Sequence, residues 1–123
     1  MNAITIVFFG SFQKYSVQIL EKLLERFTVV GVVTTPPRPA GRGLLLEPTP
    51  VSVYAKEHRL PVFALESLGA VPKELTKPDF FVVAGYGKLI PPDWLSFPRV
   101  MALNIHQSLL PQYRGAFPAE WAI

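Results

Sequence analysis

The sequence predicts an α/β fold with a mainly parallel, Rossmann-like sheet and flanking helices. Three continuous apolar runs carry this prediction: residues 4–9 (ITIVFF), 28–34 (TVVGVVT) and 79–84 (DFFVVA). Such β-rich runs are typical of strands that are buried on both faces of a parallel sheet. Helix-forming segments and loops alternate with them, as α/β proteins require. With 123 residues, the chain is long enough for one small domain.

The segments between these strands predict the remaining elements. The first strand ends at Gly10, and we expect Ser11 to cap a helix. Its apolar stripe consists of Val17, Ile19, Leu20, Leu23, Leu24 and Phe27.

Further along, residues 35–50 are so rich in proline and glycine that we expect no regular structure there. A short helix is expected within 51–59 and a brief strand at Val62 and Phe63. Residues 101–105 form another predicted strand, and 117–123 resemble the start of a helix.

Composition excludes several classes of protein. The chain is 50% hydrophobic and 17% charged, which is compatible with a packed core. It has no cysteine, so a disulfide framework and thiolate zinc sites are excluded. No apolar run reaches the roughly 18–20 residues of a membrane span, and no signal peptide is recognisable. We therefore expect a cytoplasmic or organellar-matrix protein. The net charge of +3 is weak support for a nucleic-acid partner.

Three predicted strand ends converge on one expected site. Ligands of parallel α/β sheets bind beyond the carboxyl ends of the strands. Gly10, Gly85-Tyr86-Gly87 and Asn104 lie at such ends. The turn after the first strand reads GSFQK, which is not the glycine-rich dinucleotide fingerprint, so NAD and FAD are not predicted.

Asn104 and His106 are the candidate catalytic residues. On a strand, residues i and i+2 point to the same side, so both side chains would face one space while Ile105 faces the core. An amide donor beside an imidazole suits oxyanion stabilisation and proton transfer. The alternative is a strand end whose polar groups are merely satisfied.

Two loops hold further candidates. Ser108, Leu109, Leu110 and Pro111 form either a structural turn or the lining of a flat heteroaromatic pocket. The loop of residues 38–43 (RPAGRG) holds two arginines, whose guanidinium forks suit phosphate. Its alternative is a plain surface loop. The adjoining residues 44–46 are three leucines, which would pack or meet a partner.

Order and spacing of these motifs resemble the 10-formyltetrahydrofolate-dependent formyltransferase family. The most specific stretch is residues 104–123, with Asn-x-His, Ser-Leu-Leu-Pro and Tyr-Arg-Gly-Ala in sequence. Two further matches, RPAGRG at 38–43 and YGKLIP at 86–91, are similar to the branch that acts on initiator methionyl-tRNA.

This resemblance implies formyl transfer from 10-formyltetrahydrofolate, a folate co-substrate, to the amino group of initiator methionyl-tRNA. Asn104 would polarise the formyl oxygen, and His106 would stabilise the oxyanion and assist proton transfer. The folate pocket would contain Ser108, Leu109, Leu110, Pro111, Tyr86 and Gly87. Arg38 and Arg42 would contact the tRNA, and the resemblance implies no metal site.

By the same resemblance, residues 1–123 are the N-terminal portion of the catalytic domain. The family's catalytic Asp and C-terminal domain lie beyond it, so we expect this chain alone to be inactive and the full-length protein to be a monomer. Two alternatives stay open: a relative that formylates an amino-sugar nucleotide or other small amine, and a non-catalytic folate- or partner-binding fragment. The sequence departs from the family at Gly10-Ser11-Phe12, where a Gly-Thr-Pro type turn is usual, and at leucines 44–46, where lysines are usual.

Overall fold

A five-stranded parallel sheet is the centre of the computed structural model, which describes residues 3–40, 43 and 45–105. Every pairing within this sheet is parallel, which confirms the predicted fold class. The strand order is β5-β2-β1-β6-β7. The strands are β1 (Thr5–Phe9), β2 (Thr28–Thr34), β5 (Val62–Ala64), β6 (Phe80–Val83) and β7 (Met101–Asn104).

The direction of winding reverses once within this sheet. From β1 the chain moves outward through β2 to β5, and then returns to the other side of β1 to form β6 and β7. The reversal leaves β1 and β6 as neighbours whose connections leave in opposite directions. In open α/β sheets, the crevice beyond the carboxyl ends of two such strands is the usual ligand site.

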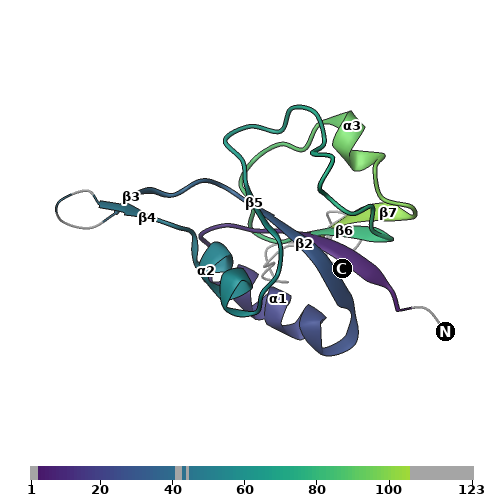
Figure 1. Cartoon of the computed structure of the whole chain (residues 1–123), viewed down its shortest axis with the longest axis horizontal. Coiled ribbons are helices and arrows are strands. Elements are labelled where there is room, and N and C mark those ends of the chain that lie inside the picture. The colour runs from purple at the N-terminus through teal and green to yellow at the C-terminus, as the bar shows by residue number, and fades with distance from the viewer. Residues whose placement is uncertain (1–2, 41–42, 44, 106–123) are drawn as a thin grey trace, which may run out of the picture.

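Each face of the sheet has its own covering layer (Figure 1). Helices α1 (Lys14–Arg26) and α2 (Pro50–Glu57) lie on one face, where Phe8, Leu20 and Val32 are fully buried. The opposite face is covered by residues 65–99, a mainly irregular segment that contains the short helix α3 (Pro92–Leu95). On that side, Phe9, Phe81 and Trp94 form the aromatic centre of the core.

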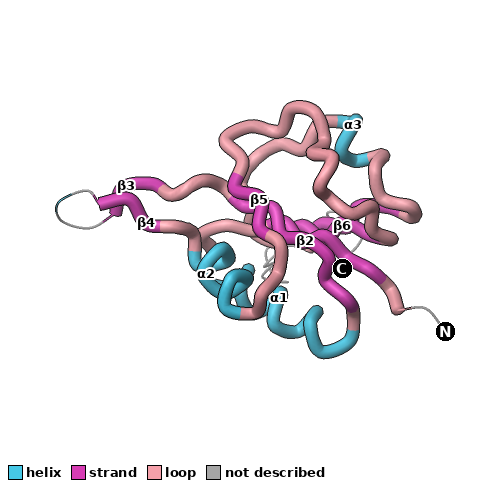
Figure 2. Tube along the Cα trace, viewed as in Figure 1, coloured by secondary structure: helices cyan, strands magenta, loops and turns pink. Residues whose placement is uncertain are grey.

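One prediction was wrong: the segment 35–50 is not free of regular structure. It forms an antiparallel hairpin of β3 (Arg38–Ala40) and β4 (Leu45–Glu47), which extends away from the sheet (Figure 2). In a two-stranded ribbon, alternate N–H groups point outward, so a proline such as Pro39 is tolerated. Leu45 and Leu46 are 72% and 68% exposed, so they do not pack on the described part of the chain.

Helix boundaries also refine the predictions. Ser11 does not cap α1, which begins at Lys14 after Gln13 and has no side-chain cap. The predicted apolar stripe of α1 is confirmed, with Leu20 fully buried and its other members packed around it. Helix α2 is capped by Thr49, whose hydroxyl accepts a hydrogen bond from the Ser52 N–H. Helix α3 was not predicted, and the helix expected at 117–123 lies outside the described residues. Within the described residues, the helices are too short or too polar to cross a bilayer.

Gly85 and Gly87 offer a matched test of this framework, because both have positive φ, at +70° and +83°. A Cβ on Gly85 would overlap Ser16 Oγ and lie 2.9 Å from the Gln13 Cβ, whereas a Cβ on Gly87 would meet nothing within 4 Å. We expect Gly85→Ala to lower the free energy of unfolding by about 2–4 kcal/mol and Gly87→Ala by about 1 kcal/mol. Urea denaturation of both variants measures this, and equal losses would contradict the packing argument.

Candidate functional site

The turns that follow β1 and β6 meet at the carboxyl edge of the sheet. The Ala84 N–H donates to the Phe9 carbonyl at 2.9 Å, and the Ser11 N–H donates to the Gly85 carbonyl at 3.2 Å. A Cβ on Gly10 would lie only 3.0 Å from the Ala84 oxygen, so the two backbones approach closely because Gly10 has no side chain. The predicted convergence of these strand ends is thus confirmed.

Helix α1 is attached to the same junction. The hydroxyl of Ser16, which is fully buried in the first turn of α1, donates to the Ala84 carbonyl at 2.6 Å. This carbonyl lies just past the end of β6, where the sheet ladder no longer supplies it with a partner. The hydrogen bond fixes the start of α1 against the turn after β6.

Asn104 lies beside this junction at the end of β7. It is the register partner of Val83, and the Ile105 N–H donates to the Val83 carbonyl at 2.7 Å. Ile105 packs on the core face that α1 and α2 cover, as predicted. Asn104 is exposed and lines a cavity of about 350 Å³, here called the β7 cavity, whose other walls are Tyr15, Val83, Ile105 and residues 85–89.

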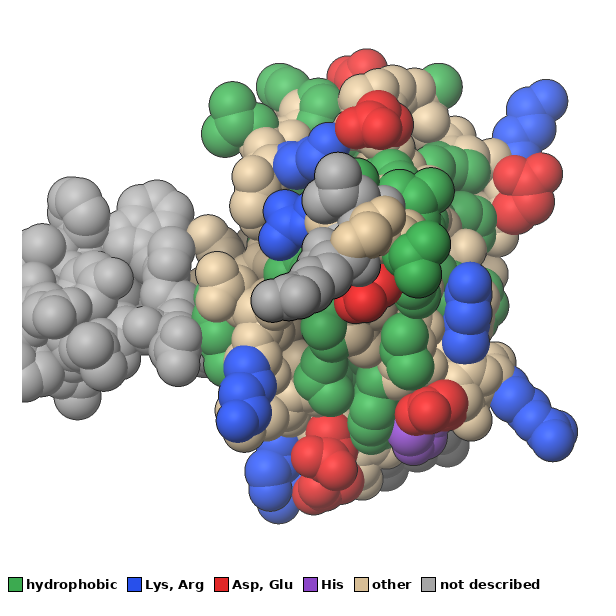
Figure 3. Space-filling model, turned by 90° about the vertical axis from the view of Figure 1, so that its left-hand side faces the viewer, with side chains coloured by type: hydrophobic (Ala, Val, Ile, Leu, Met, Phe, Trp, Pro, Cys, Tyr) green, Lys and Arg blue, Asp and Glu red, His purple; other side chains and the backbone are tan. Residues whose placement is uncertain are grey.

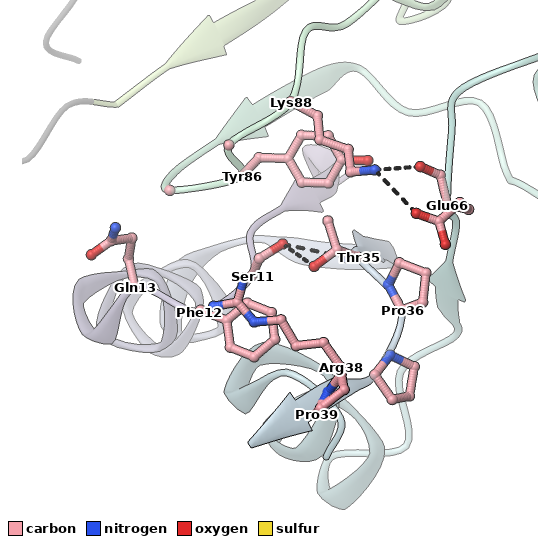
Figure 4. A pocket seen from close by; sticks show the side chains of 13 residues that line it. Ser11, Phe12, Gln13, Thr35, Pro36, Arg38, Pro39, Glu66, Tyr86 and Lys88 are labelled. Carbon is pink, nitrogen blue, oxygen red and sulfur yellow. Dashed lines mark hydrogen bonds and ion pairs between the residues drawn. The ribbon is translucent and has the colours of Figure 1, made fainter. Parts of the chain in front are cut away.

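A second cavity, of about 560 Å³, lies at the base of the hairpin and is here called the hairpin-root cavity (Figure 4). Its walls come from the turn after β1, the strand that leads into the hairpin and the loop after β5. Residues 85–88 line both cavities, so the turn after β6 is a wall that the two cavities share. The lining residues from the other segments are Ser11, Phe12, Gln13, Thr35, Pro36, Pro37, Arg38, Pro39 and Glu66.

Hydroxyl groups anchor the hairpin at this cavity. Ser11 Oγ accepts hydrogen bonds from the N–H and the hydroxyl of Thr35, at 3.3 and 3.1 Å. The buried hydroxyls of Thr34 and Thr49 are 2.6 Å apart and join the two chain segments on either side of the hairpin. The start of the hairpin and the start of α2 are therefore tied together inside the core.

Charged side chains surround the hairpin-root cavity. Lys88 Nζ lies 3.8 Å from Glu66 Oε2 and also donates to the Glu66 carbonyl, which links the turn after β6 to the loop after β5. The guanidinium carbon of Arg38 lies 3.5 Å from the centre of the Phe12 ring. Among the described residues, no carboxylate lies within ion-pair distance of Arg38.

Tyr86 contributes a buried polar group to both cavities. The residue is 3% exposed, and its ring packs edge-on against Phe9 at a centroid distance of 5.4 Å. Its hydroxyl has no hydrogen-bond partner within the described part of the chain, and burial raises the pKa of Tyr86 to about 12. Such an unpartnered buried hydroxyl is unusual, since most buried polar groups are satisfied.

Four of the predicted site residues lie in the described region, and all of them line these cavities. Asn104, Tyr86 and Gly87 line the β7 cavity, while Arg38 joins Tyr86 and Gly87 at the hairpin root. The other predicted site residues lie outside the described region: His106, Ser108, Leu109, Leu110, Pro111 and Arg42.

Sequence reasoning missed several lining residues. Ser11 and Phe12 could have been found, because they directly follow the first strand and so lie at its carboxyl end. Glu66 and Lys88 carry no such signal, because 22 residues separate them and only the folded loops bring them together. Among the described residues, no group of three His, Asp or Glu side chains is placed to hold a metal ion.

Comparison with known proteins identifies the family of the chain. A family model described as Formyl transferase matches residues 3–123. The chain is 46% identical to a methionyl-tRNA formyltransferase of Thermotoga sp. (strain RQ2), over 94% of this chain and 38% of that protein. It is 42% identical to the methionyl-tRNA formyltransferase of Clostridium novyi (strain NT), over 96% of this chain and 40% of that protein. The chain thus spans about two fifths of the length of these relatives.

A solved structure shares the fold. The glycinamide ribonucleotide transformylase 1 of Geobacillus kaustophilus superposes with a TM-score of 0.59 at 22% identity, covering 93% of this chain and 63% of that one. The parallel sheet and the cavities at its carboxyl edge define an α/β protein with a candidate ligand site at the reversal of winding. With the family match over nearly its whole length, this chain belongs to the formyl transferase family.

The buried hydroxyl of Tyr86 predicts a specific pH dependence. Its pKa is about 12 in the folded protein against 10.0 in the ordinary state, so an unfolded chain loses this proton first. The contribution of Tyr86 to stability is therefore constant well below pH 10 and falls, by an amount on the order of 1–3 kcal/mol, as the pH rises from about 10 to about 12. We expect Tyr86→Phe to be at least as stable as the parent at pH 8, because the substitution removes an unsatisfied group, and to lose less stability above pH 10. Urea unfolding from pH 8 to 12 tests this, and parallel curves for the two proteins would contradict it.

Proposed function

We propose that the full-length protein transfers a formyl group from 10-formyltetrahydrofolate to the amino group of initiator methionyl-tRNA. The observation that carries the proposal is the position of Asn104, an amide donor at the carboxyl end of β7, in a cavity beside the turn after β6. Family membership supports formyl transfer, and the names of the relatives support a methionyl-tRNA acceptor.

The chemistry of this reaction matches Asn104 and His106. The acceptor amine forms a bond to the formyl carbon, the tetrahedral intermediate carries an oxyanion, and the bond from that carbon to N10 then breaks. The amine must lose a proton and N10 must gain one. In our proposal Asn104 holds the formyl oxygen, while His106 stabilises the oxyanion and assists the proton transfers.

The folate would occupy the β7 cavity. A flat heteroaromatic ring needs apolar walls with a few polar groups that fix its orientation. Val83, Ile105 and the backbone of residues 85–89 supply both kinds of surface, so the described side of this cavity suits such a ring. We assign Tyr86 and Gly87 to this pocket, and its other wall to Ser108, Leu109, Leu110 and Pro111.

The tRNA would approach from the hairpin. Arg38 lies at the hairpin root, and the proposal assigns phosphate contacts to Arg38 and Arg42. Figure 3, which looks onto the sheet edge from the hairpin side, shows basic and acidic side chains interspersed rather than one basic surface. Recognition would therefore rely on a few placed arginines and not on a broad positive field.

His106→Ala tests the catalytic assignment. We expect this variant of the full-length protein to keep its fold and to lose about 10²–10³ in the rate of formyl transfer, since one well-placed oxyanion donor has an effect of this size. His58→Ala is the matched control, because His58 is exposed and bonds to the Tyr54 carbonyl at the end of α2. Near-normal transfer by His106→Ala, measured with initiator methionyl-tRNA, would refute the role.

Arg42→Ala separates a tRNA acceptor from a small-amine acceptor. If the acceptor is tRNA, we expect its KM to rise about tenfold or less, because one charge-assisted phosphate contact is lost. Arg26→Ala serves as the control, since Arg26 ends α1 at the opposite edge of the sheet. Kinetics with tRNA and with an amino-sugar nucleotide decide the matter, and preferred use of the sugar nucleotide would favour the alternative acceptor.

A further inference from the structure

The β3–β4 hairpin depends on its root for its orientation. Its two strands pair with each other in the register Arg38 with Glu47 and Ala40 with Leu45, and they project away from the sheet (Figure 1). A two-stranded hairpin on its own is only marginally stable in water. Contacts that tie its root to the body therefore decide where its side chains point.

One of these contacts comes from a side chain to which no role has been assigned. Phe12 is half-buried in the turn after β1, and Arg38 reaches back from the first residue of β3 to place its guanidinium carbon 3.5 Å above that ring (Figure 4). At this distance the interaction combines cation–π attraction with contact between two flat surfaces. Two elements that meet through few other groups are thereby held together.

The stacked arrangement leaves the guanidinium available to an anion. Stacking uses the face of the group, whereas its N–H donors lie in the plane and point outward from the edge. Lys88, the other described cation at this cavity, is paired with Glu66, whereas Arg38 forms no ion pair with a described carboxylate, including Glu47, its register partner across the hairpin. An anion at the hairpin root would therefore bind to Arg38, whose guanidinium is already held in one orientation by the Phe12 ring.

We propose that Phe12 is a positioning residue, which holds the Arg38 guanidinium and the hairpin root in place for a phosphate group of the acceptor RNA. This inference rests on the proposed function, because the phosphate belongs to the tRNA acceptor. A flexible arginine loses side-chain freedom when it binds a phosphate, and an arginine already stacked on a ring loses less. Phe12 thus acts on affinity for the RNA through Arg38.

A double-mutant cycle in the full-length protein tests this inference. Phe12→Leu keeps the apolar bulk and removes the aromatic face, so we expect the KM for tRNA to rise about two- to fivefold, with a smaller change in kcat. Arg38→Met should flatten the dependence of log affinity on log salt concentration by about one unit. When Phe12→Leu is added to Arg38→Met, the KM for tRNA should not rise further. Phe12→Tyr keeps an aromatic face and should have the KM of the parent protein. Phe27→Leu, at the distant end of α1, is the control and should also have the parent KM.

The outcomes separate this inference from the proposed function. An unchanged KM for tRNA in Phe12→Leu overturns the positioning role. The role is also overturned if Phe12→Leu raises KM as much in the Arg38→Met background as it does in the parent protein. If the parent protein formylates no tRNA, the proposed function is wrong, and so is the assignment of the Arg38 ligand as an RNA phosphate. The stacking itself is then read by NMR: the ring current of Phe12 should shift the Arg38 Nε–H proton upfield, and the shift should vanish in Phe12→Leu. A shift that persists in that variant rules out the contact.

Discussion

The close approach of two backbone turns, after β1 and after β6, is the constraint on which the rest of the site depends. Gly10 and Gly85 permit it: a side chain on the first would meet the Ala84 carbonyl, and one on the second would meet Ser16. Hydrogen bonds from the Ser11 N–H and the Ser16 hydroxyl then close the junction and leave no room for a ligand between the strands. The two cavities that flank residues 85–88 lie outside this junction.

The two cavities differ in the charge that they offer. The β7 cavity contains the neutral amide of Asn104, while Tyr86 and Lys88 line both cavities. The hairpin-root cavity contains Arg38 and the Lys88–Glu66 ion pair. A neutral amide donor suits a developing oxyanion, which it can stabilise by a hydrogen bond. Charged groups at an open rim suit a phosphate that arrives from solvent.

Sequence patterns predicted the parallel sheet well, because its strength comes from local runs of apolar residues. Residues 28–34 are mostly apolar, so both faces of this strand must be buried. A strand inside a parallel sheet that is covered on both sides meets this requirement. The position of Asn104 followed from the same logic, since the carboxyl ends of parallel strands share one edge. Local sequence rules did not predict the hairpin. Its regular structure depends on pairing between two strands across a turn and on anchors such as the contact between Thr34 and Thr49, which are 15 residues apart.

The residues that complete the hairpin-root cavity were unpredictable for a related reason. Glu66 belongs to an irregular segment, and its partner Lys88 follows a different strand, so neither belongs to a periodic pattern. Phe12 had a signal in its position after the first strand, but an aromatic residue at a strand end usually indicates core packing. Only the arginine above its ring distinguishes the two cases.

The anchoring of the hairpin also explains how an element with exposed leucines can serve a defined site. Leu45 and Leu46 are exposed, so neither side chain gains stability from burial in the described core. Ordering such a segment when a partner binds costs free energy in proportion to the freedom lost. The Thr34–Thr49 hydroxyl pair, the Ser11–Thr35 bonds and the Phe12–Arg38 stack restrict the root, so its side chains have little freedom left to lose when a ligand binds. Precise placement is therefore concentrated next to the hairpin-root cavity, where the Arg38 guanidinium is held.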